Sequence, residues 1–214
     1  RPDPAGRHVA LSLRIEGGHM PNPTWAAALA RPATVDADVL LQSAGAIDIR
    51  TLRVATAPLE ATASGRYVPD DKRLVDMRLT ATGGDPAMLA TILPGAAWRD
   101  LRLEMSANGT LAALDATVSL RAAALTMAPT AAATDVSFTG STQGADLSGP
   151  ALRVQLDGTV GALAAALEGG KQAVVNDMRL ALRAERSAAG VITISGLDLA
   201  SSLGHVTATG RLAA

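Results

Sequence analysis

The sequence alternates apolar and polar residues in steps of two over most of its 214 residues. Leu11, Leu13 and Ile15 are separated by polar residues, and the same spacing recurs in many later segments. Successive side chains of a strand point to opposite faces of a sheet, so this pattern predicts strands with one apolar face. Parallel strands contain continuous apolar runs, whereas alternation is typical of antiparallel sheets. We therefore predict an all-β chain with about twelve antiparallel strands.

Three segments favour short helices between these strands. Residues 23–31 and 86–93 each follow an Asn or Asp and begin with Pro, which is typical of a helix start. Residues 162–168 are rich in Ala and precede two glycines, which favours a helix that ends there. Each helix would have about two turns and would need an apolar surface for stability in water. We expect all three at the ends of the sheet.

The spacing of these segments indicates an internal repeat. The helices begin near residues 23, 86 and 162, and similar Thr- and Ser-rich strands end at Gly65, Gly140 and Gly210. The three glycines are 75 and 70 residues apart. An Ala-rich chain also produces self-similarity by chance, but two separate series agree here. We predict one continuous elongated segment, residues 1–214, with approximate repeats at 1–84, 85–160 and 161–214.

Composition excludes several classes of function. The formal net charge is −1 and only 2% of the residues are aromatic, which argues against a nucleic-acid surface. The chain has no cysteine, so disulfides, thiolate metal sites and thiol catalysis are excluded. Its longest apolar stretches are much shorter than the roughly 20 residues of a membrane helix. The chain begins with Arg1 and shows no leader pattern, so we expect a segment whose targeting sequence lies elsewhere.

No set of residues has the spacing of a catalytic or metal site. The histidines lie in three distant segments and show no ligand spacing. Asp36 and Asp38 lie two apart on one predicted strand, so we expect them on its solvated face. The sequence VPDDKR at residues 68–73 is typical of a hairpin turn. We predict no enzyme activity, no cofactor and no metal site. The histidines are His8, His19 and His205.

Two residue types leave alternatives open. Trp25 and Trp98 flank predicted helices, where they would hold a helix on the sheet or anchor a partner. Arg accounts for 17 of the 19 basic residues and commonly lies opposite the apolar face of a predicted strand. These arginines would serve as general solvent-facing charges or would contact lipid phosphates.

The repeating pattern resembles the large AsmA-like proteins and, within them, the TamB (translocation and assembly module) family. The resemblance covers roughly residues 35–212 and rests on strand–turn–strand runs that end in SGR, NGTL or TGRL. Short Pro-started helices between the strand runs add to it. The segments that carry it are ATASGRYVPDDKRLVDMRLTATGGDPAMLATILPG (61–95), DLRLEMSANGTLAALDATVSLRA (100–122) and DMRLALRAERSAAGVITISGLDLASSLGHVTATGRL (177–212).

This resemblance implies a bacterial envelope protein that is anchored in the inner membrane and crosses the periplasm. It implies a long β-taco of repeating β-groove units whose apolar groove conducts phospholipid toward the outer membrane. TamB members also pair with an outer-membrane barrel protein of the Omp85 type, which here would involve regions outside this chain. We therefore expect this chain to be a middle segment in the periplasm.

The periodicity and the resemblance agree on a curled antiparallel sheet with a groove for the acyl chains of phospholipids. Few aromatic residues are available to fill the space over its apolar face, so that face is suited to binding acyl chains. The alternative is a closed β-sandwich or β-solenoid, acting as a scaffold or adhesin stalk without lipid. The predicted groove residues are Leu101, Leu103, Met105, Val118, Leu120, Leu152, Val154, Leu156, Leu180, Leu182, Ile192 and Ile194.

Overall fold

The computed structural model describes residues 6–16, 32–42, 44–56, 59–83, 95–127, 130–146, 149, 151–166 and 172–212. Strands account for 84% of the described residues, and none of these residues lies in a helix. The thirteen strands form one curled, open antiparallel sheet, which confirms the predicted all-β class. The strands are β1 (Arg7–Ile15), β2 (Ala33–Leu41), β3 (Ile47–Thr56), β4 (Leu59–Val68), β5 (Arg73–Gly83), β6 (Ala96–Arg99), β7 (Arg102–Thr110), β8 (Ala113–Met127), β9 (Ala131–Ala145), β10 (Leu152–Ala166), β11 (Gln172–Arg186), β12 (Ile192–Ser201) and β13 (Gly204–Leu212).

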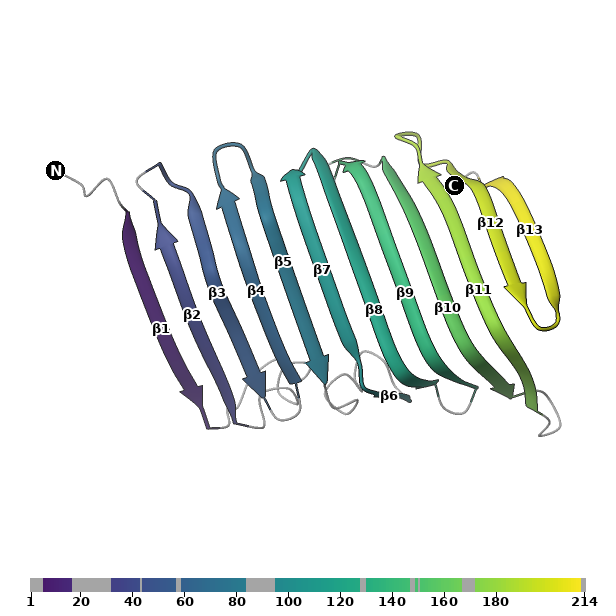
Figure 1. Ribbon diagram of the computed structural model, residues 1–214. Coiled ribbons are helices and arrows are strands. Elements are labelled where there is room, and N and C mark those ends of the chain that lie inside the picture. Colours follow the sequence, from purple (N-terminus) through teal and green to yellow (C-terminus); the bar gives the residue numbers. More distant parts are fainter. Residues whose placement is uncertain are drawn as a thin grey trace.

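The order of the strands in the sheet follows the chain from β1 to β13. Figure 1 shows this order as a colour series from purple β1 to yellow β13. The short strand β6 lies off this path and pairs with β8, beyond the end of the β7–β8 ladder. The sheet is thus a meander in which β1 and β13 form the two edges.

The strand register separates apolar from polar side chains. Leu103 lies opposite Leu120, and Leu156 lies opposite Leu182. Directly opposed residues share one face of a sheet, and the ladders through β9 connect these two pairs on the same face. We call this face the apolar face and the other one the polar face.

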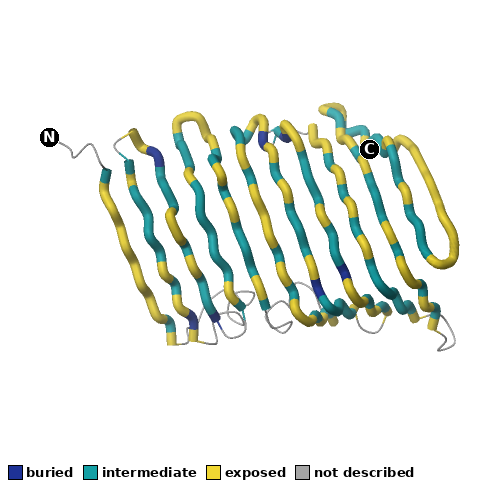
Figure 2. The backbone as a smooth tube through the Cα atoms, viewed as in Figure 1, coloured by how far each residue is buried: buried dark blue, intermediate teal, exposed yellow. Residues whose placement is uncertain are grey.

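The sheet is a single layer with little buried interior. No side chain in the described part of the chain is fully buried and large, and Figure 2 shows mainly intermediate and exposed residues. The strands contact their neighbours within the sheet, and no second sheet faces them among the described residues. The described sheet therefore has no second layer of the kind that a closed β-sandwich requires. The buried apolar residues are Ala33, Ala46, Leu114, Ala122, Val136 and Ala145.

Bulges interrupt several ladders and increase the local twist. One bulge lies in β5, where Asp76 has a φ of 48° and the register with β4 shifts. Gly65 lies opposite it with a φ of 136°, and a Cβ atom there would lie 2.6 Å from the Cα atom of Met77. Only glycine fits this position, because both the backbone angle and the close approach exclude a side chain.

A row of unusual backbone positions crosses the sheet from β6 to β11, and we call it the crease. Three of its members are aspartates with positive φ angles of 51° to 53°. The residues between them in the row are small, which lets the strands bend there. In Figure 1 the lower ends of β8 to β11 curve away from the course of their upper parts. The crease consists of Asp100, Ala123, Asp135, Gly161 and Asp177.

The burial pattern changes phase at the crease. On β11, the half-buried residues before it are Ala173 and Val175, whereas after it they include Met178 and Leu180. The separation is odd, so a regular strand would place the two pairs on opposite faces. Asp177 lies between them with a φ of 52° and absorbs this change. The crease therefore divides β11 into two parts with opposite alternation.

The predicted helix at residues 162–168 is wrong. Residues 162–166 form the end of β10 and pair with β11 on one side and β9 on the other. Helix propensity is a weak preference, and a place between two paired strands overrides it. The helices predicted at residues 23–31 and 86–93 lie outside the described residues.

The turn predicted at residues 68–73 is confirmed. The chain turns between β4 and β5 at residues 69–72, where the Lys72 amide donates to the Pro69 carbonyl oxygen at 3.0 Å. A second turn joins β11 to β12, where the Ser187 amide donates to the Val191 carbonyl oxygen at 2.9 Å. Gly190 in this turn has a φ of 81°, which favours glycine.

Candidate functional site

The register places eleven of the twelve predicted groove residues on the apolar face of β7, β8, β10, β11 and β12. Leu101 directly precedes β7 and lies outside a strand. Between β8 and β10, strand β9 contributes Phe138 and Gly140 to the same face. The eleven strand residues are Leu103, Met105, Val118, Leu120, Leu152, Val154, Leu156, Leu180, Leu182, Ile192 and Ile194.

These residues form rows that run across the strands. Each strand contributes one residue to a row, so neighbours in a row are about 5 Å apart. An extended alkyl chain laid along a row would contact consecutive strands. One such row in this region contains Leu79, Met105, Val118, Gly140, Leu156, Leu182, Leu197 and Ala208.

The apolar face remains partly open to solvent. Met105 is 41% exposed, Leu152 is 38% exposed and Ile192 is 39% exposed. These three exposed side chains lie on β7, β10 and β12 and share one face with the apolar residues of the strands between them. Such surfaces on proteins commonly mark sites of protein, membrane or ligand binding.

Sequence reasoning missed the pair that β9 and β10 form at the centre of this face. Phe138 lies directly opposite Gly158, and a Cβ atom at Gly158 would overlap the Phe138 ring. The glycine therefore makes room for the single phenylalanine of the chain. An isolated glycine within an alternating strand often marks such a close approach and was the available signal.

The apolar face also extends over the first strands, which the predicted site did not include. Leu11 and Leu13 of β1 lie opposite Ala37 and Val35 of β2, and the same face continues through Val54 of β3. Their alternation is as regular as that of the predicted site. The apolar surface thus runs over the whole described sheet, from one edge strand to the other.

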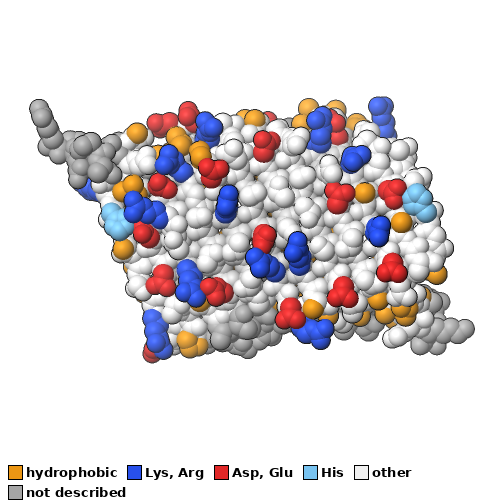
Figure 3. Space-filling view, viewed as in Figure 1, with side chains coloured by type: hydrophobic (Ala, Val, Ile, Leu, Met, Phe, Trp, Pro, Cys, Tyr) orange, Lys and Arg blue, Asp and Glu red, His pale blue; other side chains and the backbone are white. Residues whose placement is uncertain are grey.

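The polar face carries ion pairs along and between strands. Arg102 and Glu104 on β7 are 2.6 Å apart, and Arg153 on β10 lies 3.4 Å from Glu185 on β11. Figure 3 shows basic and acidic side chains scattered over this face, with much of the surface formed by other residues. These arginines are exposed, which agrees with the solvent-facing alternative. Such exposed pairs contribute little to stability.

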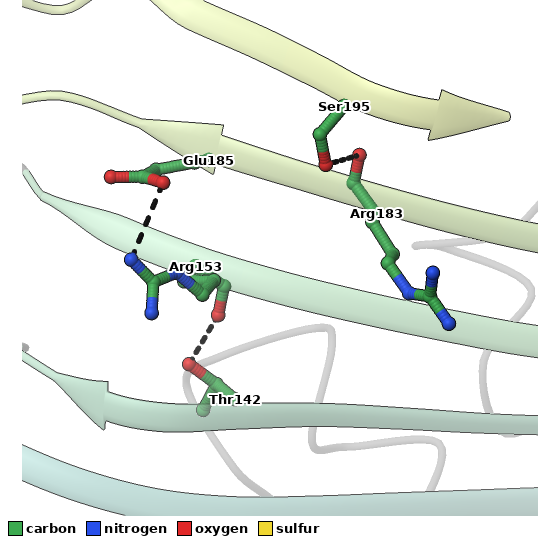
Figure 4. Close-up of polar contacts among 5 residues, drawn as sticks. All are labelled: Thr142, Arg153, Arg183, Glu185 and Ser195. Carbon is green, nitrogen blue, oxygen red and sulfur yellow. Dashed lines mark hydrogen bonds and ion pairs between the residues drawn. The ribbon is translucent and has the colours of Figure 1, made fainter.

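Side-chain hydrogen bonds satisfy backbone carbonyls near the irregular parts of the ladders. Figure 4 shows the Thr142 hydroxyl donating to the Arg153 carbonyl oxygen at 2.5 Å, while the Arg153 guanidinium lies toward Glu185. The Ser195 hydroxyl donates to the Arg183 carbonyl oxygen at 3.3 Å, next to the register shift between β11 and β12. These contacts have a structural role.

Shallow hollows are present on the polar face. One of about 500 Å³ lies over β11 to β13, and its lining includes Arg183, Asp198 and Thr207. Another of about 370 Å³ lies over β9 to β12 and includes Asp157 and Arg179. Both are wide open to solvent.

The described histidines are surface residues on the two edge strands. His8 on β1 lies 2.6 Å from Asp38, and His205 on β13 lies 3.0 Å from Asp198. His19 lies outside the described residues. Within the described part of the chain, no three His, Cys, Asp or Glu side chains are grouped as metal ligands. Asp36 lies on the polar face, as predicted, and its carboxylate accepts a hydrogen bond from the Ser12 hydroxyl at 2.7 Å.

Trp98 lies within the sheet itself. It occupies β6 opposite Leu125 of β8, and its indole nitrogen donates to the Gly83 carbonyl oxygen at 3.3 Å. This hydrogen bond connects β6 to the end of β5 and so links these two strands at one end of the sheet. Trp25 lies outside the described residues. No helix among the described residues is long and apolar enough to cross a membrane.

The fold and this site define an all-β protein with one open antiparallel sheet and a continuous apolar face. No family model, curated protein or solved structure matches the chain.

Proposed function

We propose that this chain is a periplasmic segment of a bridge-like lipid-transport protein that carries phospholipid acyl chains on its apolar face. The observation that carries the proposal is the continuity of that face across all strands from β1 to β13, with large side chains partly exposed. The resemblance to the AsmA-like and TamB proteins supports the envelope setting. In that setting an Omp85-type barrel would be a partner of regions outside this chain.

The energetics of the apolar face favour an apolar ligand. Each buried methylene group contributes about 0.8 kcal/mol, so an acyl chain of about sixteen carbons would gain on the order of 10 kcal/mol before ordering costs. The ligand would in turn remove partly exposed residues such as Met105 and Ile192 from water. This contribution depends on area and is nearly independent of headgroup identity.

The arrangement of side chains supports transport along the sheet. The apolar rows cross every strand without a charged residue at their centre, as in the row through Leu156 and Leu182. An acyl chain can exchange one hydrophobic contact for the next along such a row. A scaffold would not require an uninterrupted apolar surface of this length.

Site-specific photo-crosslinking tests the proposal. A crosslinker at Leu103, Val154 or Leu182 of the protein in its native envelope should capture phospholipid, because these side chains share the apolar face. Matched positions on the same strands but on the polar face should not capture it. The matched positions are Arg102, Arg153 and Arg179.

Two results would contradict the proposal. Equal capture from both faces would indicate non-specific adsorption to the sheet. Capture of another polypeptide, and of no lipid, by crosslinkers on the apolar face would indicate that a protein covers this face. That result would favour the scaffold function.

A further inference from the structure

One charged side chain shares the apolar face of β10 to β12. The register places Arg186 opposite Leu152 of β10 and opposite Ile192 of β12. Arg7 on β1 also lies on the apolar face. The other charged strand residues in the described part of the chain lie on the polar face, apart from those in the bulges and the crease.

Arg186 lies in a row of exposed apolar residues at the rim of the sheet, which we call the rim row. Leu152 is 38% exposed, Ile192 is 39% exposed and Leu212 is 68% exposed. A cationic side chain between such residues combines an apolar surface with a positive charge, which is the combination that an anionic amphiphile requires. The rim row consists of Leu152, Arg186, Ile192 and Leu212.

The acidic groups near Arg186 do not neutralise it. Glu185 precedes it on β11, but alternation places this carboxylate on the polar face, where Arg153 lies 3.4 Å from it. Within the described residues, no carboxylate lies within ion-pair distance of the Arg186 guanidinium. Its five donors therefore remain available for an anion.

A second polar group at the same rim has an unmet hydrogen-bonding capacity. The Ser187 hydroxyl is buried and has no hydrogen-bond partner within the described residues. The Ser187 backbone amide is already used, because it donates to Val191 at 2.9 Å and closes the turn after β11. Because the Ser187 hydroxyl is buried whereas Arg186 is exposed, the Arg186 guanidinium is the group of this pair that can meet an anion from solvent.

We propose that this rim binds the phosphodiester headgroup of a phospholipid whose acyl chains lie on the adjacent apolar face. This inference rests on the proposed function and adds the place of the headgroup and the residue that binds it. The guanidinium forms paired hydrogen bonds with phosphate oxygens, which a neutral glyceride lacks. The acyl chains would extend from Arg186 toward Ala184 and Leu182, the next residues of β11 on the same face.

Lipid capture with matched ligands tests this inference. The purified chain is mixed with phosphatidylglycerol or with diacylglycerol of identical acyl chains, and bound lipid is quantified by mass spectrometry after gel filtration. The wild-type chain should retain more phosphatidylglycerol, and Arg186→Gln should reduce this preference by about tenfold. The control Arg179→Gln removes a cation from the polar face of the same strand and should leave the preference unchanged.

Each other outcome has a defined meaning. If the wild-type chain retains both lipids equally, if Arg186→Gln keeps the preference, or if Arg179→Gln loses it equally, the headgroup site is wrong while acyl binding stands. If the wild-type chain retains neither lipid, the proposed function fails, and the headgroup site fails with it. Circular dichroism of both variants verifies that the sheet is intact, and Arg186→Lys should restore part of the preference because it keeps the charge.

Discussion

The ring of Phe138 on β9 occupies the space beside Gly158 on β10 where any other residue would place its Cβ atom. The two residues are directly paired across the ladder at the centre of the apolar face. A glycine in a strand exposes backbone and lacks a side chain to pack, and the adjacent ring compensates for both.

We expect Gly158→Ala to lower the free energy of unfolding by about 1–3 kcal/mol, because the new methyl group displaces the Phe138 ring. Urea unfolding followed by circular dichroism measures the change. Gly196→Ala is the matched control, since a Cβ atom there meets nothing within 4 Å. Equal effects of the two substitutions would show that β propensity, and not the ring contact, determines the outcome.

The aspartates of the crease should tolerate glycine better than a β-branched residue. Asp177 has a φ of 52°, a region that costs most residues about 1–2 kcal/mol. Asp177→Gly should therefore leave the free energy of unfolding nearly unchanged, whereas Asp177→Val should lower it by about that amount. Asp157→Val is the control at an extended position on β10. If Asp157→Val lowered the free energy of unfolding as much as Asp177→Val, the backbone conformation of Asp177 would not be the cause.

A charge on the apolar face should abolish lipid binding without unfolding the chain. Val154→Asp places a carboxylate among the apolar rows, and water can reach it because the sheet is a single open layer. We expect lipid capture to be lost while stability falls by only about 1 kcal/mol. Thr159→Asp adds the same charge to the polar face of β10 and should keep lipid capture. Global unfolding by Val154→Asp alone would indicate a closed core.

The end of β10 should respond to substitution as a strand. Ala164 pairs with Val174 of β11 and with Ala132 of β9. Ala164→Val should be neutral or stabilising by up to about 0.5 kcal/mol, because β-branched residues are favoured in strands. In a helix the same change would be destabilising by a similar amount. Thermal unfolding of the Ala164→Val variant distinguishes a strand from a helix at this position. A clear loss of stability would support the predicted helix and contradict the strand.

Much of the candidate site could be predicted from local spacing. Leu103, Val154 and Leu182 each belong to a short alternating segment, and alternation alone decides which residues of a strand share a face. The turn at residues 68–73 was predictable for a similar reason, since Pro and Asp favour turns through their own backbone chemistry. These features depend on residues that are close in sequence.

Other features could not be predicted in this way. The helix expected at residues 162–168 followed from Ala propensity, but pairing with residues 131–134 and 172–176 makes residues 162–166 a strand. Propensity differences of a few tenths of a kcal/mol per residue cannot outweigh two ladders of backbone hydrogen bonds. The neighbours of Arg186 in the rim row could not be predicted either, because they depend on how β11 pairs with β10 and with β12.

The sequence by itself determined the strand class, the two faces and the turn at residues 68–73, because a period of two residues directly specifies which side chains share a face. Only the tertiary structure decided that the sheet stays open, that the crease at Asp135 and Asp177 reverses the alternation, and that Gly158 receives the Phe138 ring. These outcomes depend on the register between strands and on whether the edge strands β1 and β13 meet. Both arise from contacts between distant residues, which a local pattern does not encode.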